Sequence, residues 1–234
     1  MSLDLFNNKY VCVVLSCKRP YYENRRKANI DTFNILKSCG FVVVYAYSDN
    51  ALTSIEIEPI EEGKEYVMTV PAPEIYELLS HKMNIVYNYF SKTSCKGILK
   101  IDDNTKILFS DIIEHDFMDL ITQYDYVGLE QVIISKDSDP YYKLKNRTQM
   151  PIFTNIYHKI DIDVKYFAGP FYYVSKKAIN TISEEGLQMA YEDMAVGHAV
   201  SKNKHIKRFM WNFKNIAVSW DNATEQDQKN KSNK

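Results

Sequence analysis

Two short runs of buried-type residues flank an amphipathic segment near the start of the chain. Residues 10–15 (YVCVVL) and 41–47 (FVVVYAY) are rich in β-branched and aromatic side chains and are predicted to be strands. Between them, residues 24–38 place apolar side chains at roughly helical intervals, and Gly40 follows as a helix terminator. A strand, a helix and a strand in this order form a βαβ unit, whose strands are parallel. The sequence therefore predicts an α/β fold with a parallel sheet and helices on its faces.

The rest of the chain continues this alternation. Residues 97–101 (GILKI) and 124–129 are further predicted strands. Helices are expected at 73–91, 111–122, 176–182 and 191–202, an acidic linker at 56–63 and a polar surface loop at 135–149. Residues 222–234 contain no large apolar side chain and are expected to form a disordered polar tail, which leaves 1–221 as one folded domain.

Charge and cysteine usage argue against several classes of partner. The 29 Lys and Arg residues nearly balance the 30 Asp and Glu residues, so we expect no nucleic-acid partner. The 4 cysteines form no Cys-x-x-Cys pair, and the first residues lack the basic and apolar regions of a signal sequence. The apolar stretches are far shorter than the roughly 20 residues of a membrane span. These features predict a cytoplasmic protein with no membrane span.

Acidic side chains follow one of the predicted strands directly. Asp102, Asp103 and Asn104 come after residues 97–101, and ligands bind at the carboxyl ends of strands in open α/β sheets. Paired oxygen ligands there suit a divalent cation that also holds a diphosphate. The same residue types are ordinary turn formers, so a plain surface turn is an open alternative.

A second acidic pair precedes a predicted helix. Glu192 and Asp193 could act on a substrate, or they could simply be first-turn acids that favour the positive end of the helix dipole. Gly169 and Pro170 lie within an aromatic segment and could form a plain turn. Each of these features alone leaves the function open.

Their order along the chain resembles the inverting β-1,3-galactosyltransferase and Fringe group of GT-A glycosyltransferases. The similar blocks, in order, are residues 23–33 (ENRRKANIDTF), 45–49 (YAYSD), 100–104 (KIDDN), 166–175 (YFAGPFYYVS) and 191–197 (YEDMAVG). The resemblance implies a single GT-A (Rossmann-like) domain with a central mixed, mostly parallel sheet flanked by helices. It also implies a hexosyltransferase that moves a sugar from a nucleotide-sugar, a UDP-sugar by this likeness, to a glycan acceptor.

The resemblance assigns roles to individual residues. Asp193 would be the general base that takes the proton of the acceptor hydroxyl, with inversion at the anomeric carbon. Ser16 and Asp49, at the ends of two strands, would meet the uridine, and Arg25 or Arg26 would reach the phosphates. A solvated helix face is the alternative for the two arginines.

The metal and the sugar pocket also follow from the resemblance. Mn²⁺ or Mg²⁺ would be held by the acidic triplet, namely Asp103 and Asn104, with Asp102 close to both the metal and the donor. The pocket for the sugar or the acceptor would include Gly169, Pro170, Phe171 and Glu192.

The chain departs from the family pattern in three places. Asn104 stands where the family has a third Asp, which lowers the charge available to a metal. No His lies beyond His205, although the family uses a downstream His as a metal ligand, and Gly169-Pro170-Phe171 replaces a run of glycines.

Two other functions are compatible with these residues. A metal-dependent phosphoesterase or nuclease could use Asp102, Asp103 and Asp193 as a two-metal site. A nucleotide-sugar-binding domain without catalytic activity would account for Asn104 and the missing His.

Overall fold

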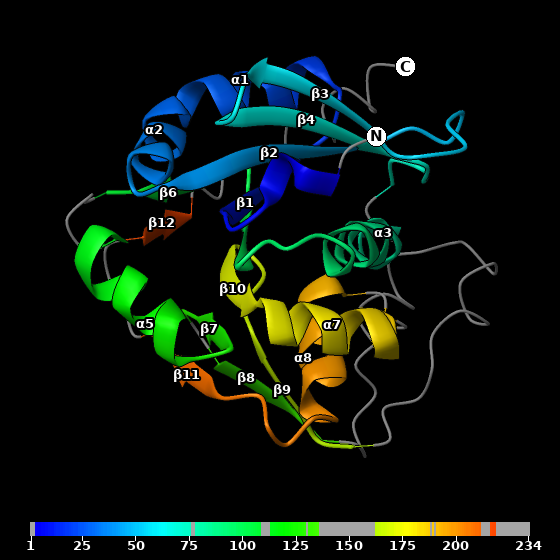
Figure 1. Cartoon of the computed structure of the whole chain (residues 1–234). Coiled ribbons are helices and arrows are strands. Elements are labelled where there is room, and N and C mark those ends of the chain that lie inside the picture. The colour runs from blue at the N-terminus through cyan, green and yellow to red at the C-terminus, as the bar shows by residue number, and fades with distance from the viewer. Residues whose placement is uncertain are drawn as a thin grey trace, which may run out of the picture.

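The computed structural model describes residues 3–75, 78–108, 113–129, 131–135, 162–187, 189, 191–211 and 216–218. Its centre is a mixed sheet of 8 strands in the order β11-β7-β10-β5-β1-β2-β4-β3 (Figure 1). The strands are β1 (Tyr10–Leu15), β2 (Phe41–Ser48), β3 (Glu56–Glu61), β4 (Glu65–Val70), β5 (Gly97–Asp102), β7 (Tyr126–Gly128), β10 (Phe171–Ser175) and β11 (Arg208–Met210).

The strands β1, β2 and β5 run parallel, as the sequence predicts, and β4 is also parallel to β2. The strand β10 is antiparallel to both β5 and β7, and the edge strand β3 is antiparallel to β4. The strand β1 has β2 on one side and β5 on the other. After β1 the chain continues to β2 on one side, and after β5 it continues to β7 on the other side. The gap between these two diverging connections is the switch point, at which open α/β sheets form a crevice.

The remaining elements surround this sheet. Two small antiparallel sheets pair β6 (Thr105–Ile107) with β12 (Ile216–Val218) and β8 (Gln131–Ile134) with β9 (Val164–Phe167). The helices are α1 (Pro20–Ala28), α2 (Ile30–Ser38), α3 (Leu79–Ser91), α5 (Met118–Gln123), α7 (Lys176–Glu185) and α8 (Glu192–Ser201), with a 3₁₀ turn η1 (Leu3–Phe6) and a π turn η3 (Ile113–Phe117).

The alternation of side chains along β1 divides the core into two layers. Val11 and Val13 pack with residues of α3, α7 and α8, whereas Cys12 and Val14 pack with residues of α2 and α5 on the other face. Strand side chains point alternately to the two faces, so a sheet that is covered on both sides needs apolar residues at every position. This requirement explains why residues 10–15 and 41–47 form continuous apolar runs.

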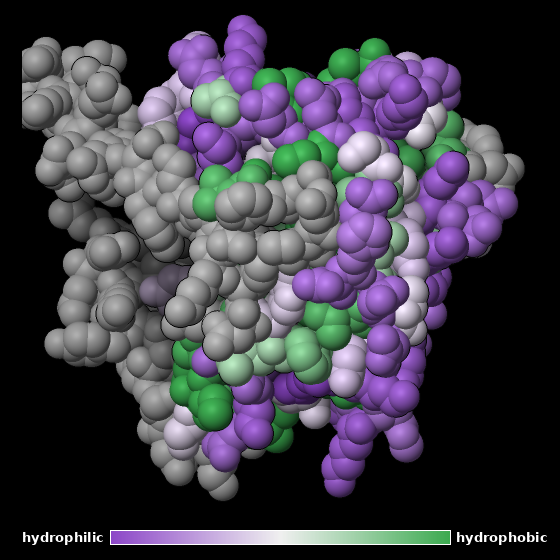
Figure 2. All heavy atoms as spheres, turned by 90° about the vertical axis from the view of Figure 1, so that its left-hand side faces the viewer, coloured by the Kyte–Doolittle hydropathy of each residue, from purple (hydrophilic) through white to green (hydrophobic). Residues whose placement is uncertain are grey.

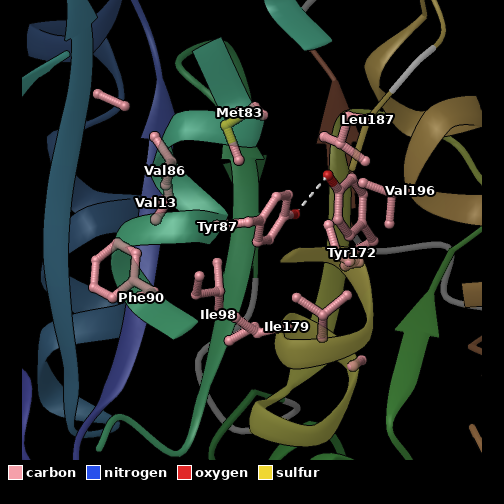
Figure 3. Packing of buried hydrophobic residues seen from close by; sticks show 14 of the residues in the cluster. Val13, Met83, Val86, Tyr87, Phe90, Ile98, Tyr172, Ile179, Leu187 and Val196 are labelled. Atoms are coloured by element: carbon pink, nitrogen blue, oxygen red, sulfur yellow. Dashed lines mark hydrogen bonds between the residues drawn. The ribbon is translucent and has the colours of Figure 1, made fainter. Parts of the chain in front are cut away.

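Two tyrosines carry polar groups into the layer between β10 and α3. The hydroxyl groups of Tyr87 and Tyr172 lie 3.0 Å apart and hydrogen-bond to each other (Figure 3). Apolar side chains surround them, including Met83, Ile98 and Val196. Buried hydroxyl groups need such partners, because an unpaired one costs about 1–3 kcal/mol.

Hydrophilic side chains cover most of the described surface in the view of Figure 2, and the hydrophobic residues that show form separate small patches. Scattered exposure of this kind is normal for a folded domain. Among the described residues, the exposed large hydrophobic side chains come from separate parts of the chain: Ile30, Ile60, Ile75, Leu108, Ile133 and Met210.

The predicted strands at 10–15, 41–47 and 97–101 are confirmed as β1, β2 and β5. The prediction of one helix over 24–38 is wrong, because α1 starts earlier, at Pro20, and ends at Ala28 before α2 begins. The side-chain amide of Asn29 donates to the carbonyl of Asp103 at 2.7 Å, and its own backbone leaves the helical region. This contact ties the helix break to the end of β5.

The predicted acidic linker at 56–63 is also wrong, since most of it forms β3. Ile57 is opposite Met68 in this antiparallel pair, and most other β3 residues are exposed. An edge strand buries little, so its single apolar contact is hard to recognise in a run of Glu residues. The predicted helix over 73–91 begins only at Leu79.

Two predictions fall outside the described residues. These are most of the polar loop at 135–149 and the whole tail at 222–234. In the part of the chain that is described, no helix combines the length and the apolar character needed to cross a bilayer.

Gly197 lies where α8 packs closely on β9, and its replacement tests this packing. A Cβ atom added there would lie 2.2 Å from Tyr166 Cβ and 2.9 Å from the carbonyl oxygen of Lys165. Gly197→Ala should therefore lower the free energy of unfolding by about 1–3 kcal/mol, measured by denaturant titration. Lys202→Ala, at the exposed end of the same helix, should change it by less than about 1 kcal/mol. An unchanged midpoint for Gly197→Ala would show that the helix can move away from the strand.

Candidate functional site

A cavity of about 490 Å³ lies at the carboxyl ends of β1 and β5. This is the switch point of the sheet, where ligands bind in open α/β folds. The lining residues come from both strand ends, from α1, and from the start of α3 with the segment before it: Leu15, Ser16, Cys17, Arg19, Tyr22, Arg25, Glu74, Ile75, Leu79, Asp102, Asp103 and Asn104.

The register of the sheet places Ser16 beside Asp103. Leu15 is opposite Asp102 in the parallel pairing of β1 and β5, so the next residue of each strand also lies at this edge. Ser16 Oγ donates a hydrogen bond to Asp103 Oδ2 at 2.8 Å, and the backbone N–H of Asp103 donates to the carbonyl of Leu15 at 3.3 Å. The two strand ends are thus joined by both backbone and side-chain contacts.

The two predicted arginines have different surroundings. Arg25 lines the cavity, and its Nη1 lies 3.5 Å from Asp103 Oδ1. Arg26 donates from Nη1 to Ser16 Oγ at 3.0 Å, and its guanidinium lies over the rings of Tyr45 and Tyr47. Arg25 therefore faces the cavity, whereas Arg26 supports the residues behind it.

Asp103 is largely buried among these partners. Burial raises the pKa of its carboxyl group to about 6, although the hydrogen bond from Ser16 and the charge of Arg25 act in the opposite direction. Loss of hydration disfavours the charged form more than these partners favour it. The fold therefore fixes the partners of Asp103 and makes its carboxyl group harder to ionise than a fully hydrated one.

Lys100 organises a second group of charges on the neighbouring side of β5. Its Nζ donates to Asp102 Oδ1 and to the carbonyl of Gly169, each at 2.6 Å, and lies 3.4 Å from Glu192 Oε2. Burial alone would lower the pKa of Lys100, but Asp102 and Glu192 outweigh it, so the pKa is raised. Lys100 is not among the site residues that the sequence predicts, although a lysine inside an apolar strand beside an acidic triplet is a signal for a buried ion pair.

The predicted Glu192-Asp193 pair occupies the first turn of α8. Glu192 is buried and accepts a hydrogen bond from the hydroxyl of Tyr172, and burial raises its pKa to about 7. Asp193 Oδ2 accepts from the backbone N–H of Gly169 at 3.0 Å, and Oδ1 accepts from Met194 N–H at 2.8 Å. Burial also raises the pKa of Asp193.

The residues predicted for a sugar or acceptor pocket separate in the structure. Gly169 contacts Asp193 and Lys100, and the carbonyl of Pro170 accepts from Thr105 Oγ1 at 2.8 Å. The side chain of Phe171 is fully buried in the core, and its ring packs on Phe117 and Trp211. Phe171 is therefore placed to support the turn and does not face an open pocket.

Asp49 does not line the cavity, and a different acidic residue does. Asp49 Oδ1 accepts from the backbone of Ala51 at 2.9 Å and so closes its own turn. Glu74 accepts from the backbone of Ser48 at 2.7 Å and from Lys82 Nζ at 3.0 Å. No local pattern in the sequence points to Glu74, because its role depends on these distant partners.

Lys82 is a second buried lysine at this site. Its side chain is 1% exposed, and Nζ donates to the carbonyl of Ser16 at 2.7 Å as well as to Glu74. Burial lowers its pKa, with Glu74 acting in the opposite direction. Lys82 and Glu74 thus connect α3 with the ends of β1 and β2.

The acidic triplet does not converge on one point. Asp102 pairs with Lys100, whereas Asp103 pairs with Ser16 and Arg25. Among the residues that the structure describes, no three His, Cys, Asp or Glu side chains form a group that could hold a metal ion. The described residues therefore do not complete the predicted set of ligands, and binding of Mn²⁺ or Mg²⁺ stays a prediction.

No protein-family model matches the chain, and no curated protein sequence matches it. The likeness to glycosyltransferases consequently rests on the sequence blocks, and any function has to be inferred from the geometry of the site.

The raised pKa values predict that stability falls as the pH rises. Glu192 has an ordinary pKa of 4.5 when unfolded and about 7 when folded, so the folded state holds the extra proton between these values. Its contribution is present at low pH and is lost as the pH rises through 7. Asp103 acts in the same direction between 3.8 and about 6.

Glu192→Gln should therefore reduce the pH dependence of the unfolding free energy between pH 4.5 and 8. The expected change in this difference is of the order of 1 kcal/mol or more. Glu58→Gln, on the exposed strand β3, is the matched control and should keep the wild-type slope. An identical slope for Glu192→Gln would mean that this carboxyl group is not held in its neutral form by burial.

Proposed function

We propose that the chain is an inverting glycosyltransferase with a single GT-A domain, which transfers a sugar from a nucleotide-sugar to a hydroxyl group of a glycan acceptor. The observation that carries the proposal is the placement of two different charges about one strand end. Arg25 lines the cavity on one side of β5, and the carboxylate of Asp193 lies on the other side next to Gly169. Such a pair suits a reaction that needs a cation for the leaving group and a base for the attacking group.

In this proposal the donor occupies the cavity between β1 and β5. A UDP-sugar agrees with the sequence resemblance, and Ser16, Arg25 and Tyr22 are the lining residues that offer a hydroxyl, a guanidinium and an aromatic ring. The negative charge of the diphosphate would face the guanidinium, which is well suited to phosphate oxygens. Mn²⁺ or Mg²⁺, when bound, would add positive charge beside the diphosphate.

Asp193 supplies the base. As the acceptor oxygen forms a bond to the anomeric carbon, the bond to the leaving diphosphate breaks and the hydroxyl proton passes to Asp193. Burial raises the pKa of Asp193 toward neutral pH, and a general base is more effective when its pKa is closer to the working pH. The N–H groups of Gly169 and Met194 hold the carboxylate in one orientation.

A nucleotide-sugar-binding domain without transferase activity is the second candidate. It is favoured by Asn104, which carries no charge, and by the pairing of both Asp103 oxygens within the protein. A phosphoesterase has less support, because the carboxylates of a two-metal site have to converge on the metal ions. The carboxylate of Asp102 instead pairs with Lys100, and that of Asp103 pairs with Arg25.

Asp193→Asn should abolish transfer while donor binding is kept. General-base assistance contributes about 10²–10⁴-fold, so the turnover number should fall by at least about 100-fold. The dissociation constant of the donor should stay within about threefold, because Asp193 acts on the acceptor. Asp116→Asn, on the exposed turn η3, is the control. Retention of most of the activity by Asp193→Asn would remove this residue from the mechanism.

A panel of UDP-glucose, UDP-galactose, UDP-N-acetylglucosamine and GDP-mannose tests the class of protein. One UDP-sugar should raise the melting temperature and be slowly hydrolysed, since ligands that bind only the folded state stabilise it. Stabilisation without hydrolysis or transfer would indicate the binding domain. Release of nitrophenol from bis(p-nitrophenyl) phosphate would indicate a phosphoesterase.

A further inference from the structure

Arg25 carries a hydrogen-bond donor that the fold leaves unused. Its side chain is 14% exposed, and Nε is buried without a hydrogen-bond partner among the described residues. Its guanidinium lies 5.2 Å from the ring centre of Tyr21 and 5.5 Å from that of Tyr22, so the group is held in place by its neighbours. Buried donors without a partner are rare in folded proteins and call for an explanation such as a ligand.

Asp103 fixes this guanidinium, and each of its two carboxylate oxygens already has a partner within the protein. Its Oδ1 faces Arg25 Nη1, its Oδ2 accepts from Ser16, and its carbonyl accepts from the amide of Asn29. A metal ion on Asp103 would have to compete with Arg25 for the same carboxylate. Asp103 is accordingly a positioning residue for Arg25.

The other acidic residues of the cavity are already paired with buried cations. Glu74 pairs with Lys82 at 3.0 Å, and Asp102 pairs with Lys100 at 2.6 Å. Among the residues that the structure describes, Arg25 pairs with one carboxylate, that of Asp103, and Arg19 adds a further positive charge to the lining. This balance favours an anionic ligand over a free cation.

We propose that Arg25 forms a phosphate-binding subsite that holds a nucleoside diphosphate without a divalent cation. The inference rests on the proposed function for the identity of the nucleotide, but it departs from the cation site that the acidic triplet predicts. The guanidinium presents a fork of N–H groups that matches phosphate oxygens, and the aromatic rings beside it restrict its orientation. Asp103 and Ser16 set its position at the end of β1.

The test measures binding by calorimetry, with inorganic pyrophosphate and UDP as probes. Wild-type protein should bind both probes in EDTA, and the UDP affinity in EDTA should lie within about threefold of that in Mn²⁺. Pyrophosphate is used only in EDTA, because it binds Mn²⁺ itself. Arg25→Met keeps the length of the side chain but removes its charge. It should weaken the affinity for both probes by about 10-fold or more, as expected when a hydrogen bond from a charged group is lost.

Lys27→Met is the matched control, since it removes the same charge from α1 at a side chain that is 70% exposed and pairs with Glu23. It should change binding by less than about threefold, and Arg25→Lys should recover part of the loss. Equal binding by Arg25→Met and Lys27→Met would overturn the subsite. The subsite would also be overturned if wild-type protein bound UDP in the presence of Mn²⁺ but not in EDTA. This measurement uses the wild type only, so it decides the question even if Arg25→Met does not fold.

The two proposals fail in different ways. If pyrophosphate binds through Arg25 but no nucleotide-sugar binds or reacts, the subsite stands and the glycosyltransferase proposal fails. If a UDP-sugar is transferred only with Mn²⁺ and pyrophosphate does not bind in EDTA, the subsite fails and the glycosyltransferase proposal stands.

Discussion

The parallel pairing of β1 with β5 determines where every group of the site lies. These strands are neighbours in space but are separated in the chain by β2, β4 and α3. Their ends meet because the chain adds β2 and β4 on one side of β1 and then returns to add β5 on the other side. Leu15 lies opposite Asp102 in this pairing. A shift of one residue would turn the side chains of β5 to the opposite face and bury Asp102 in place of its apolar neighbours. The apolar packing of both faces therefore fixes the position of the polar site.

The helix α1 depends on this strand end more than on packing. None of its side chains is buried, and a helix of this length is marginal by itself. Its attachment consists mainly of polar contacts, in which Arg25 meets Asp103 and Arg26 meets Ser16. Hydrogen bonds to charged groups contribute about 1.5–3 kcal/mol each when they are protected from water. Elements held in this way open locally more easily than core strands.

The sequence predicts the strands well because a sheet covered on both faces requires continuous apolar runs. It predicts part of the site, since Ser16 and Arg25 follow the first strand of the predicted βαβ unit, and Asp103 follows another predicted strand that ends at the same edge of the sheet. The distant partners of Lys100 and Glu74 could not be predicted in the same way. Lys100 reaches a carbonyl 69 residues further along the chain, and no local pattern reports such a partner. The break at Asn29 is missed for the same reason, because its cause is a contact with Asp103.

The alternation of side chains at the end of β5 explains why two adjacent acidic residues serve different halves of the site. Successive residues of a strand point to opposite faces, so Asp102 reaches Lys100 and Asp103 reaches Arg25. Lys100 in turn holds the carbonyl of Gly169, whose N–H fixes Asp193. One short segment thus positions the guanidinium that faces the cavity and, through Lys100, the carboxylate on the other side. Since both halves share this support, a displacement of β5 would move the two groups together and preserve their relative geometry better than separate supports could.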